Sequence, residues 1–200
     1  MAAPRGEGLS QLVRALGLAC ALLVLSACTT PGVKQGVDGI NLPAPRAMFE
    51  AEGRLSARHG AQAFAANFRW QHVGERDSLE FSSPLGQTIA VLSGDASGVR
   101  FESADGRRAA ADDWIALTEA GLGWRLPVGG LSSWIQGAPR TGAPYSVEPG
   151  DDGRPAVLRQ DGWTIVYLAY APGEDSALRP SRITLEYPEI ELRLAVDAWH

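Results

Sequence analysis

Apolar and polar residues alternate along much of the chain after about residue 48, which is typical of strands with one apolar face. Ala66, Phe68 and Trp70 share one side of such a stretch, and polar residues separate them. The segment 190–197 repeats this alternation near the C-terminus, and the Asp-Gly pair in SADGRR (103–108) favours a hairpin turn. These patterns predict an antiparallel meander with one polar and one apolar face.

Two short stretches have helical spacing instead of alternation. The first, ADDWIALTEAGLG (111–123), has an apolar side centred on Trp114, and the second, LPVGGLSSWIQG (126–137), has one centred on Trp134. Helices of this length persist only when an apolar side packs on another element. The predicted fold is therefore mainly β (α+β), a single curved antiparallel sheet whose apolar face is covered by two short helices.

The N-terminal residues have the features of a secretory signal. Arg5 and Arg14 supply positive charge, and 15–25 is an apolar run shorter than the ~20 residues that a membrane-spanning helix needs. The run ends in Leu25-Ser26-Ala27-Cys28, which resembles a bacterial lipobox. That resemblance implies cleavage before Cys28, with a diacylglycerol thioether and an N-acyl group on this cysteine. An uncleaved anchor, or an ordinary signal that contains a cysteine, is the alternative.

These features divide the chain into three parts. Residues 1–27 are predicted to be a lipoprotein signal peptide, 28–47 a lipidated cysteine with a flexible Pro- and Gly-rich tether, and 48–200 the folded domain. Thr29 stands where an Asp would be the common inner-membrane retention signal of such lipoproteins. The prediction is a lipid-anchored protein of the outer membrane that faces the periplasm.

Composition excludes several function classes. The formal net charge is −5 and no basic block is present, so an electrostatic nucleic-acid footprint is not expected. Cys20 and Cys28 are the only cysteines, and His59, His72 and His200 have no metal-ligand spacing. The chain also lacks a Gly-x-Ser-x-Gly elbow and a phosphate-binding loop. We expect no enzyme activity, no cofactor and no metal. A carboxylate pair formed across strands is the alternative that sequence spacing does not test.

The informative residues are apolar, and the chain contains six tryptophans. Two helices over an apolar sheet face can enclose a cavity for an apolar ligand. The candidate lining residues come from both layers: Phe68, Trp70, Phe81, Ile89, Val91, Phe101, Trp114, Leu117, Leu131, Trp134, Ile135, Trp163 and Tyr167. The alternative is that these side chains fill the space and form a solid core.

A second feature is the turn sequence SSPLGQT (82–88). Pro84 and Gly86 are typical turn residues, but Leu85 between them stands where a polar residue is expected. A single exposed leucine is ordinary on a protein surface. On a membrane-tethered protein it can also insert into lipid or into a partner.

Five segments together resemble the LolB family of outer-membrane lipoprotein receptors. In order, they are Phe68-x-Trp70, SPLGQT (83–88), LGWRLPVGGLSSWIQGAP (122–139), QDGWTIVYLAY (160–170) and LRPSRITLEYPEIELRLAVDAW (178–199). The resemblance covers about 49–200 together with the lipobox. It implies an incomplete antiparallel barrel, closed by helices over a cavity for acyl chains. Members have a longer amphipathic helix before the first strand, whereas this sequence leaves room only for a brief helix around 46–52.

The resemblance also implies a function. A monomer would accept lipoproteins from the periplasmic carrier LolA and insert them into the inner leaflet of the outer membrane. Leu85, flanked by Pro84 and Gly86, would be the apolar residue that delivers cargo into the bilayer. Two other classes compete with this one: a structural or assembly lipoprotein with a solid core, and a hydrolase, which predicts a carboxylate or hydroxyl cluster in the pocket.

Overall fold

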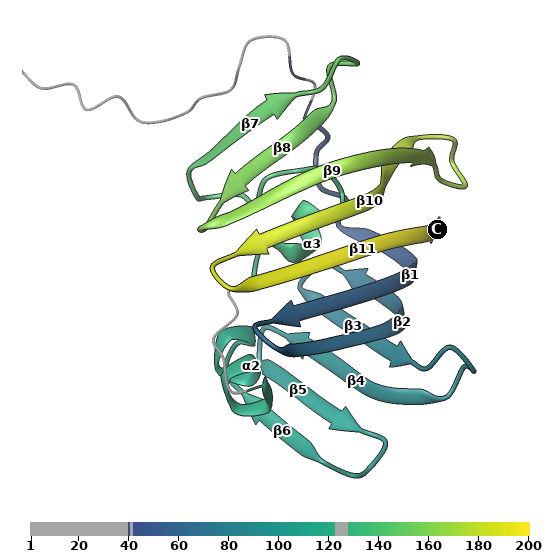
Figure 1. Cartoon of the computed structure of the whole chain (residues 1–200), viewed down its shortest axis with the longest axis vertical. Helices are drawn as coiled ribbons and strands as arrows, with labels where there is room; N and C mark the ends of the chain where they lie inside the picture. Colours follow the sequence, from purple (N-terminus) through teal and green to yellow (C-terminus); the bar gives the residue numbers. More distant parts are fainter. Residues whose placement is uncertain (1–39, 41, 123–127) are drawn as a thin grey trace, which may run out of the picture. The chain divides into compact units, whose positions relative to one another are not determined.

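The computed structural model describes residues 40, 42–122 and 128–200. These residues form an 11-stranded antiparallel sheet in the order β6-β5-β4-β3-β2-β1-β11-β10-β9-β8-β7 (Figure 1). Its elements are β1 (Met48–His59), β2 (Gln62–Val73), β3 (Arg76–Ser82), β4 (Thr88–Asp95), β5 (Gly98–Ser103), β6 (Arg108–Ala111), α2 (Trp114–Leu122), α3 (Leu131–Trp134), β7 (Tyr145–Pro149), β8 (Pro155–Gln160), β9 (Trp163–Pro172), β10 (Leu178–Tyr187) and β11 (Ile190–Trp199). Within the described chain, β6 and β7 are the two edges and do not pair, so the sheet is open. This confirms the predicted mainly β fold.

β1 lies at the centre of the sheet and pairs with β2 on one side and β11 on the other. The brief helix expected around 46–52 is therefore wrong, because the strand begins at Met48. Phe49 and Ala51 are buried on one face, and the two glutamates that alternate with them are more exposed. That period of two suits a strand paired on both sides, and the sheet supplies hydrogen bonds along both of its edges.

The register of the strands gives the sheet one apolar and one polar face. On the apolar face, Phe68 of β2 stands opposite Phe81 of β3, and the same row continues through Ala90 of β4. On the polar face, Arg69 of β2 lies between Glu52 and Glu80 of the adjacent strands. Its guanidinium is 2.7 Å from the Glu52 carboxylate.

One end of the apolar face is a solid core under α3. The Trp134 side chain is fully buried, and its ring lies 6.1 Å from that of Trp163 on β9. Ile165, Ile183 and Leu185 from β9 and β10 belong to the same buried cluster. Figure 1 places α3 over this part of the sheet.

The second helix, α2, packs against the other end of the same sheet, on β5 and β6. Trp114 at its start lies directly over Gly94 of β4, where a Cβ atom would come within 2.6 Å of the indole ring. The glycine therefore provides the space into which Trp114 fits. The prediction that two short helices cover the apolar face is confirmed for these described elements.

The residues just before β1 belong to the folded domain. Ile40 and Leu42 pack against the core cluster. The backbone N–H of Arg46 donates to Gln136 Oε1 at 2.8 Å, and Gln136 Nε2 donates back to the Arg46 carbonyl at 3.4 Å. The apolar side chains at 40 and 42 are partly buried, whereas the division of the chain into a tether of 28–47 and a domain of 48–200 stays a prediction.

Candidate functional site

The apolar face is incompletely covered between the two helices. Leu55 of β1, Leu79 and Phe81 of β3, and Leu92 of β4 are only partly buried there. Phe64 of β2, on the same face of the sheet, is 41% exposed. A strip of half-buried apolar side chains thus crosses β1 to β4, next to the solid core beneath α3. This strip is the candidate binding surface for an apolar ligand.

The structure separates the predicted lining residues into two groups. Seven are buried and belong to the packed interior: Phe68, Trp70, Leu117, Trp134, Ile135, Trp163 and Tyr167. Five others are partly buried: Phe81, Ile89, Phe101, Trp114 and Leu131. Ile89 falls at a shift of the register between β3 and β4. Only the second group has surface left with which to contact a ligand, and their role in lining a cavity stays a prediction.

Val91 was predicted on the wrong face. It stands opposite Glu80 of β3 and Glu102 of β5, which belong to the polar side of the sheet. Ala90 and Leu92 occupy the apolar side instead. The cause is the run Ile-Ala-Val-Leu, which is apolar at every position, so alternation could not select a face.

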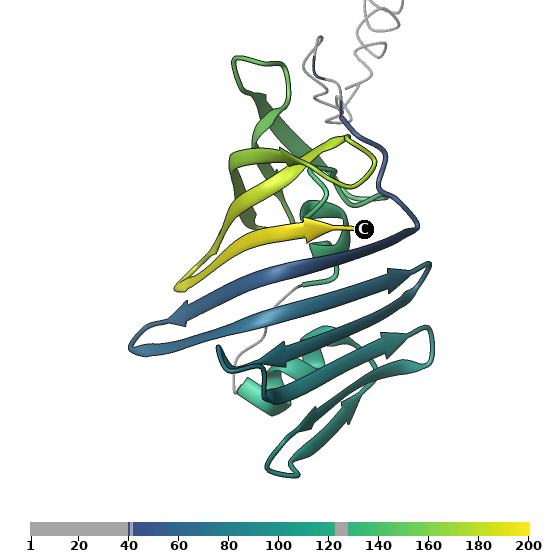
Figure 2. The same ribbon diagram turned by 90° about the vertical axis from the view of Figure 1, so that its right-hand side faces the viewer.

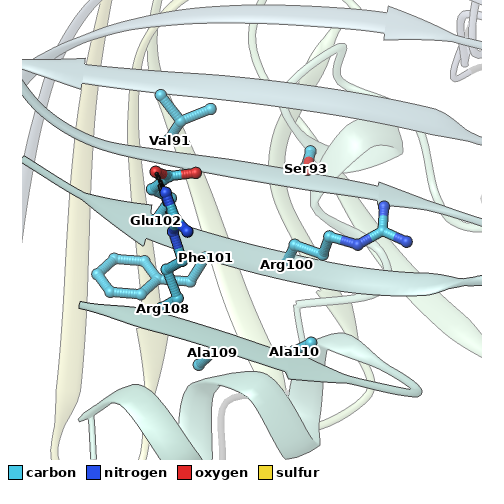
Figure 3. A pocket seen from close by; sticks show the side chains of 8 residues that line it. All are labelled: Val91, Ser93, Arg100, Phe101, Glu102, Arg108, Ala109 and Ala110. Atoms are coloured by element: carbon cyan, nitrogen blue, oxygen red, sulfur yellow. Dashed lines mark hydrogen bonds and ion pairs between the residues drawn. The ribbon is translucent and has the colours of Figure 1, made fainter. Parts of the chain in front are cut away.

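Two hollows have walls made of described residues, and both lie on the polar face. The first, of about 370 Å³, is lined by Val91, Ser93 and Arg100 together with the Glu102–Arg108 ion pair (Figure 3). The second, of about 510 Å³, is lined mainly by polar and charged residues, including Glu52, Asn67, Arg69, Glu80 and Asp197. Neither is the apolar cavity predicted between helices and sheet.

The β3–β4 turn presents Leu85 to solvent. The Leu85 side chain is 88% exposed, the largest value among the described exposed large hydrophobic residues. Below it, the backbone N–H of Gly86 donates to the Ser83 carbonyl at 2.9 Å, and the N–H of Ser83 donates to the Gln87 carbonyl at 2.8 Å. Gly86 has φ = +81°, which a glycine adopts without strain. The turn holds its apolar tip away from the sheet.

Asn67 of β2 adds a side-chain contact to this turn that the sequence did not indicate. Its Nδ2 atom donates to the Ser83 carbonyl at 3.1 Å. Phe64, on the same strand, was also missed, since it stands among alanines where the alternation is weak. The signal available in the sequence was one large aromatic residue among the small residues at that end of the strand.

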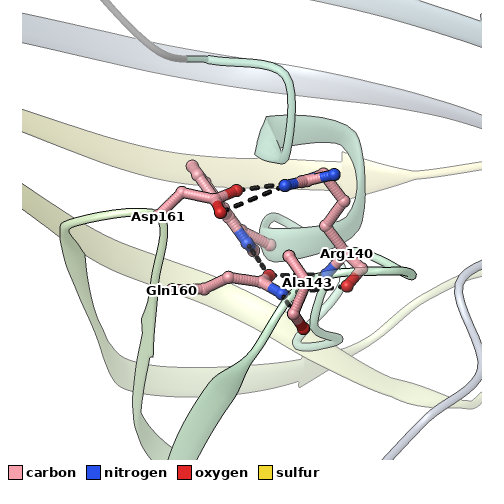
Figure 4. A network of polar contacts seen from close by, with 5 residues as sticks. Arg140, Ala143, Gln160 and Asp161 are labelled. Atoms are coloured by element: carbon pink, nitrogen blue, oxygen red, sulfur yellow. Dashed lines mark hydrogen bonds and ion pairs between the residues drawn. The ribbon is translucent and has the colours of Figure 1, made fainter.

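A polar network fixes the segment that follows α3 (Figure 4). The Gln160 side chain is buried, and its Oε1 accepts from Trp134 Nε1 at 2.8 Å and from the Arg140 backbone N–H at 2.7 Å. Its Nε2 donates to the carbonyls of Arg140 at 2.9 Å and Ala143 at 3.2 Å. The Arg140 guanidinium hydrogen-bonds Asp161, and this contact raises the pKa of Arg140. The network joins the segment after α3 to β8 and stabilises the covered end of the apolar face.

Ionisable groups near the apolar face are engaged in structural contacts. Asp77 accepts hydrogen bonds from Trp70 Nε1 at 2.7 Å and contacts His72 Nδ1 at 2.8 Å. The Tyr167 hydroxyl donates to the Trp134 carbonyl at 2.8 Å, and burial raises the pKa of Tyr167. Among the described residues, no three His, Cys, Asp or Glu side chains gather as a metal site would require.

Two predictions concern the N-terminal region. Cys28 and the signal peptide 1–27 lie outside the described residues. In the described part of the chain, no helix has the length and apolar character needed to cross a bilayer. Lipidation of Cys28 stays a prediction from the sequence.

Known proteins resemble this chain over most of its length. An outer-membrane lipoprotein LolB from Thiobacillus denitrificans is 40% identical over 159 residues, covering 79% of this chain and 83% of the relative. The LolB of Nitrosomonas europaea is 33% identical and covers 89% of this chain and 88% of its own. A solved LolA superfamily structure from Nitrosomonas europaea superposes with a TM-score of 0.46 at 9% identity, over 79% of this chain and 87% of that one.

The family match includes both parts of the candidate site. The profile of the family described as outer membrane lipoprotein LolB matches residues 47–199, which contain the half-buried strip and the Leu85 turn. This range also contains all eleven strands of the described sheet, from β1 to β11. The chain belongs to the LolB family.

Proposed function

We propose that this protein is an outer-membrane lipoprotein receptor that takes acylated lipoproteins from a LolA-type periplasmic carrier and inserts them into the inner leaflet of the outer membrane. The observation that carries the proposal is the half-buried apolar strip on β1 to β4, beside a turn whose leucine is exposed to solvent. Family membership and the names of the relatives support the same role. Cys28 would supply the lipid anchor.

The transfer needs no chemical step on the cargo. Each methylene that leaves water gains about 0.8 kcal/mol, so exposing a whole acyl chain during transfer would be costly. A handover from one apolar surface to another avoids this exposure, and a modest difference in affinity then sets the direction. Leu79, Phe81 and Leu92 offer shape-tolerant apolar contacts of the kind an acyl chain requires.

Leu85 would act at the membrane step. Its turn is fixed by backbone hydrogen bonds, so the side chain can enter the bilayer without first becoming ordered. Burying an exposed leucine in lipid contributes about 2 kcal/mol. This contribution would hold the end of the protein against the leaflet while the acyl chains move.

The alternative of a solid core has some support from one end of the molecule. The side chains of Trp134, Trp163 and Ile165 fill the space below α3, and all three are almost inaccessible to solvent. A fluorescent fatty-acid probe separates the two functions. The receptor proposal requires saturable binding that weakens when Phe81 or Leu79 is changed to Ser, whereas an assembly lipoprotein with a filled core would not bind the probe.

The direct test is extraction of cargo from a carrier. The chain from Thr29 onward contains all of the described core, and it is mixed with a purified carrier–lipoprotein complex. We expect the lipoprotein to move to this protein without ATP and to stay soluble in the absence of membranes. If the cargo remains with the carrier at all protein concentrations, the receptor function is wrong.

A further inference from the structure

We propose that the tip of the β1–β2 hairpin is a second membrane-contact element beside Leu85, and that Phe64 marks the exit through which acyl chains pass into the bilayer. This inference rests on the proposed function and adds a location for its last step. It follows from three observations: the position of the hairpin, the contacts of Phe64, and the charge of the surrounding sequence.

The hairpin tip and the Leu85 turn lie at the same end of the sheet. β1 ends and β3 ends there, because the strands are antiparallel and consecutive turns alternate between the two ends. In Figure 2 the β1–β2 hairpin reaches beyond the β3–β4 and β10–β11 turns. A bilayer surface that meets Leu85 therefore also meets this hairpin.

Phe64 joins this end to the half-buried strip. The last pair between β2 and β3 is Asn67 with Ser82, so 62–66 runs on alongside the Leu85 turn. The Phe64 ring packs edge-on against Phe81, with the ring centres 6.0 Å apart and an interplanar angle of 82°. Across β1, Phe64 stands opposite Ala57, which packs against the core cluster. Phe64 is thus the outermost apolar side chain of the strip.

The composition of the hairpin suits a lipid surface. Residues 60–66 read Gly-Ala-Gln-Ala-Phe-Ala-Ala and carry no charge, so the tip can enter the interfacial region without burying an ion. The chain has no Asp or Glu between 53 and 74, although its overall net charge is negative. Arg58 stands near the tip, and Glu191 opposite it on β11 is already paired with Arg193. Arg58 is therefore placed to meet lipid phosphates.

Two of the carboxylates in the turns at this end are paired with arginines. Asp105 in the β5–β6 turn pairs with Arg107 at 2.9 Å, and Asp161 in the β8–β9 turn pairs with Arg140 at 2.9 Å. Glu189 in the β10–β11 turn lies 3.8 Å from His59. Asp105 and Asp161 are thus neutralised by neighbouring arginines, and the uncharged hairpin tip and Leu85 are the features that favour a bilayer.

Site-specific labels test the contact directly. Because the chain from Thr29 onward has no cysteine, single cysteines at 62, 75 or 85 take an environment-sensitive fluorophore at one position each. The probe surface is vesicles of phosphatidylethanolamine and phosphatidylglycerol. We expect blue-shifted emission for labels at 62 and 85, and no shift for Glu75→Cys, whose turn lies at the opposite end of the sheet.

The outcomes separate this inference from the function beneath it. A shift at 85 with none at 62 overturns the second contact and leaves the receptor function intact. No shift at either position contradicts both the hairpin contact and the membrane role of Leu85. Arg58→Gln should weaken vesicle binding about five-fold, as the loss of one basic group near anionic lipid predicts; unchanged binding would contradict the role given to its charge.

A transfer assay tests the exit. Starting from protein already loaded with cargo, Phe64→Ser should release it into vesicles about ten-fold more slowly than the wild type, since part of the apolar path is lost. Val73→Ser is the matched control, because Val73 is 50% exposed at the opposite end of the same strand. Equal release rates for the two variants, with unchanged melting temperatures, would show that acyl chains leave elsewhere.

Discussion

Asn67 and Ser83 connect a central strand to the turn that exposes Leu85, through a hydrogen bond of 3.1 Å from the Asn67 side chain to the Ser83 carbonyl. The turn also has its own backbone hydrogen bonds, so Asn67 sets its position relative to β2 and not its internal shape. The side chain is therefore a positioning residue for Leu85.

Replacing Asn67 with Ala should loosen this placement. We expect a loss of about 1 kcal/mol in the free energy of unfolding, the usual contribution of one hydrogen bond, and slower insertion of cargo with unchanged acceptance. Gln71→Ala is the control, because Gln71 lies on the same strand as Asn67 but its side chain donates to Glu50 of β1, away from the turn. Equal insertion rates in both variants would remove the positioning role.

Gln160 should be one of the most sensitive polar residues for stability. Gln160→Met keeps most of the volume but leaves the Trp134 indole N–H and the Arg140 backbone N–H without their acceptor. We expect the free energy of unfolding, measured with urea, to fall by about 3 kcal/mol, since buried donors would lose their partners. Arg140→Met removes only the partly exposed ion pair with Asp161 and should cost less than about 1 kcal/mol. Similar losses in the two variants would contradict this account.

Gly94 should be required for α2 to pack on the sheet. An alanine there would place its Cβ 2.6 Å from the Trp114 ring and 2.8 Å from Val99, so the helix must shift. We expect the free energy of unfolding to fall by about 1–3 kcal/mol, and the near-ultraviolet circular dichroism signal of Trp114 to change. Gly129→Ala, where a Cβ meets no atom within 4 Å, is the control and should leave both unchanged.

Stability should fall in acid partly through Asp175. Hydrogen bonds from Arg179 hold the pKa of Asp175 well below its ordinary value of 3.8. A carboxylate with a lowered pKa in the folded state adds stability above its unfolded pKa, and this stability is lost as the pH falls below that value. Asp175→Asn should therefore melt at a lower temperature than the wild type at pH 7, with a smaller difference near pH 3. Asp151→Asn, in an exposed turn, is the matched control for the loss of one surface carboxylate.

The sequence predicted the fold because its informative signals are local. Alternation at Phe68 and Trp70, the Asp-Gly turn and the spacing around Trp134 each depend on a few neighbouring residues. The Leu85 turn was found in the same way, since Pro84 and Gly86 mark a turn whatever the surrounding fold. Such local signals can be interpreted from the sequence without knowledge of tertiary contacts.

The errors arose where tertiary contacts decide the outcome. Val91 belongs to an all-apolar run, and its face depends on the register with β3 and β5. The strand beginning at Met48 replaced an expected helix because it pairs on both sides. Leu42 packs against the core cluster, and Phe64 contacts Phe81. Both contacts are between residues that are distant in sequence, so no local pattern could indicate them.

The central claim is that Leu85 acts in delivery and not in acceptance, and a two-step transfer assay of Leu85→Glu tests it most directly. The side chain is almost fully exposed, so the variant should fold with a change in stability within about 0.5 kcal/mol. The account predicts that it takes a lipoprotein from the carrier at the wild-type rate and fails to insert it into vesicles. Wild-type insertion by Leu85→Glu, or failure of the folded variant to accept cargo, would contradict the account.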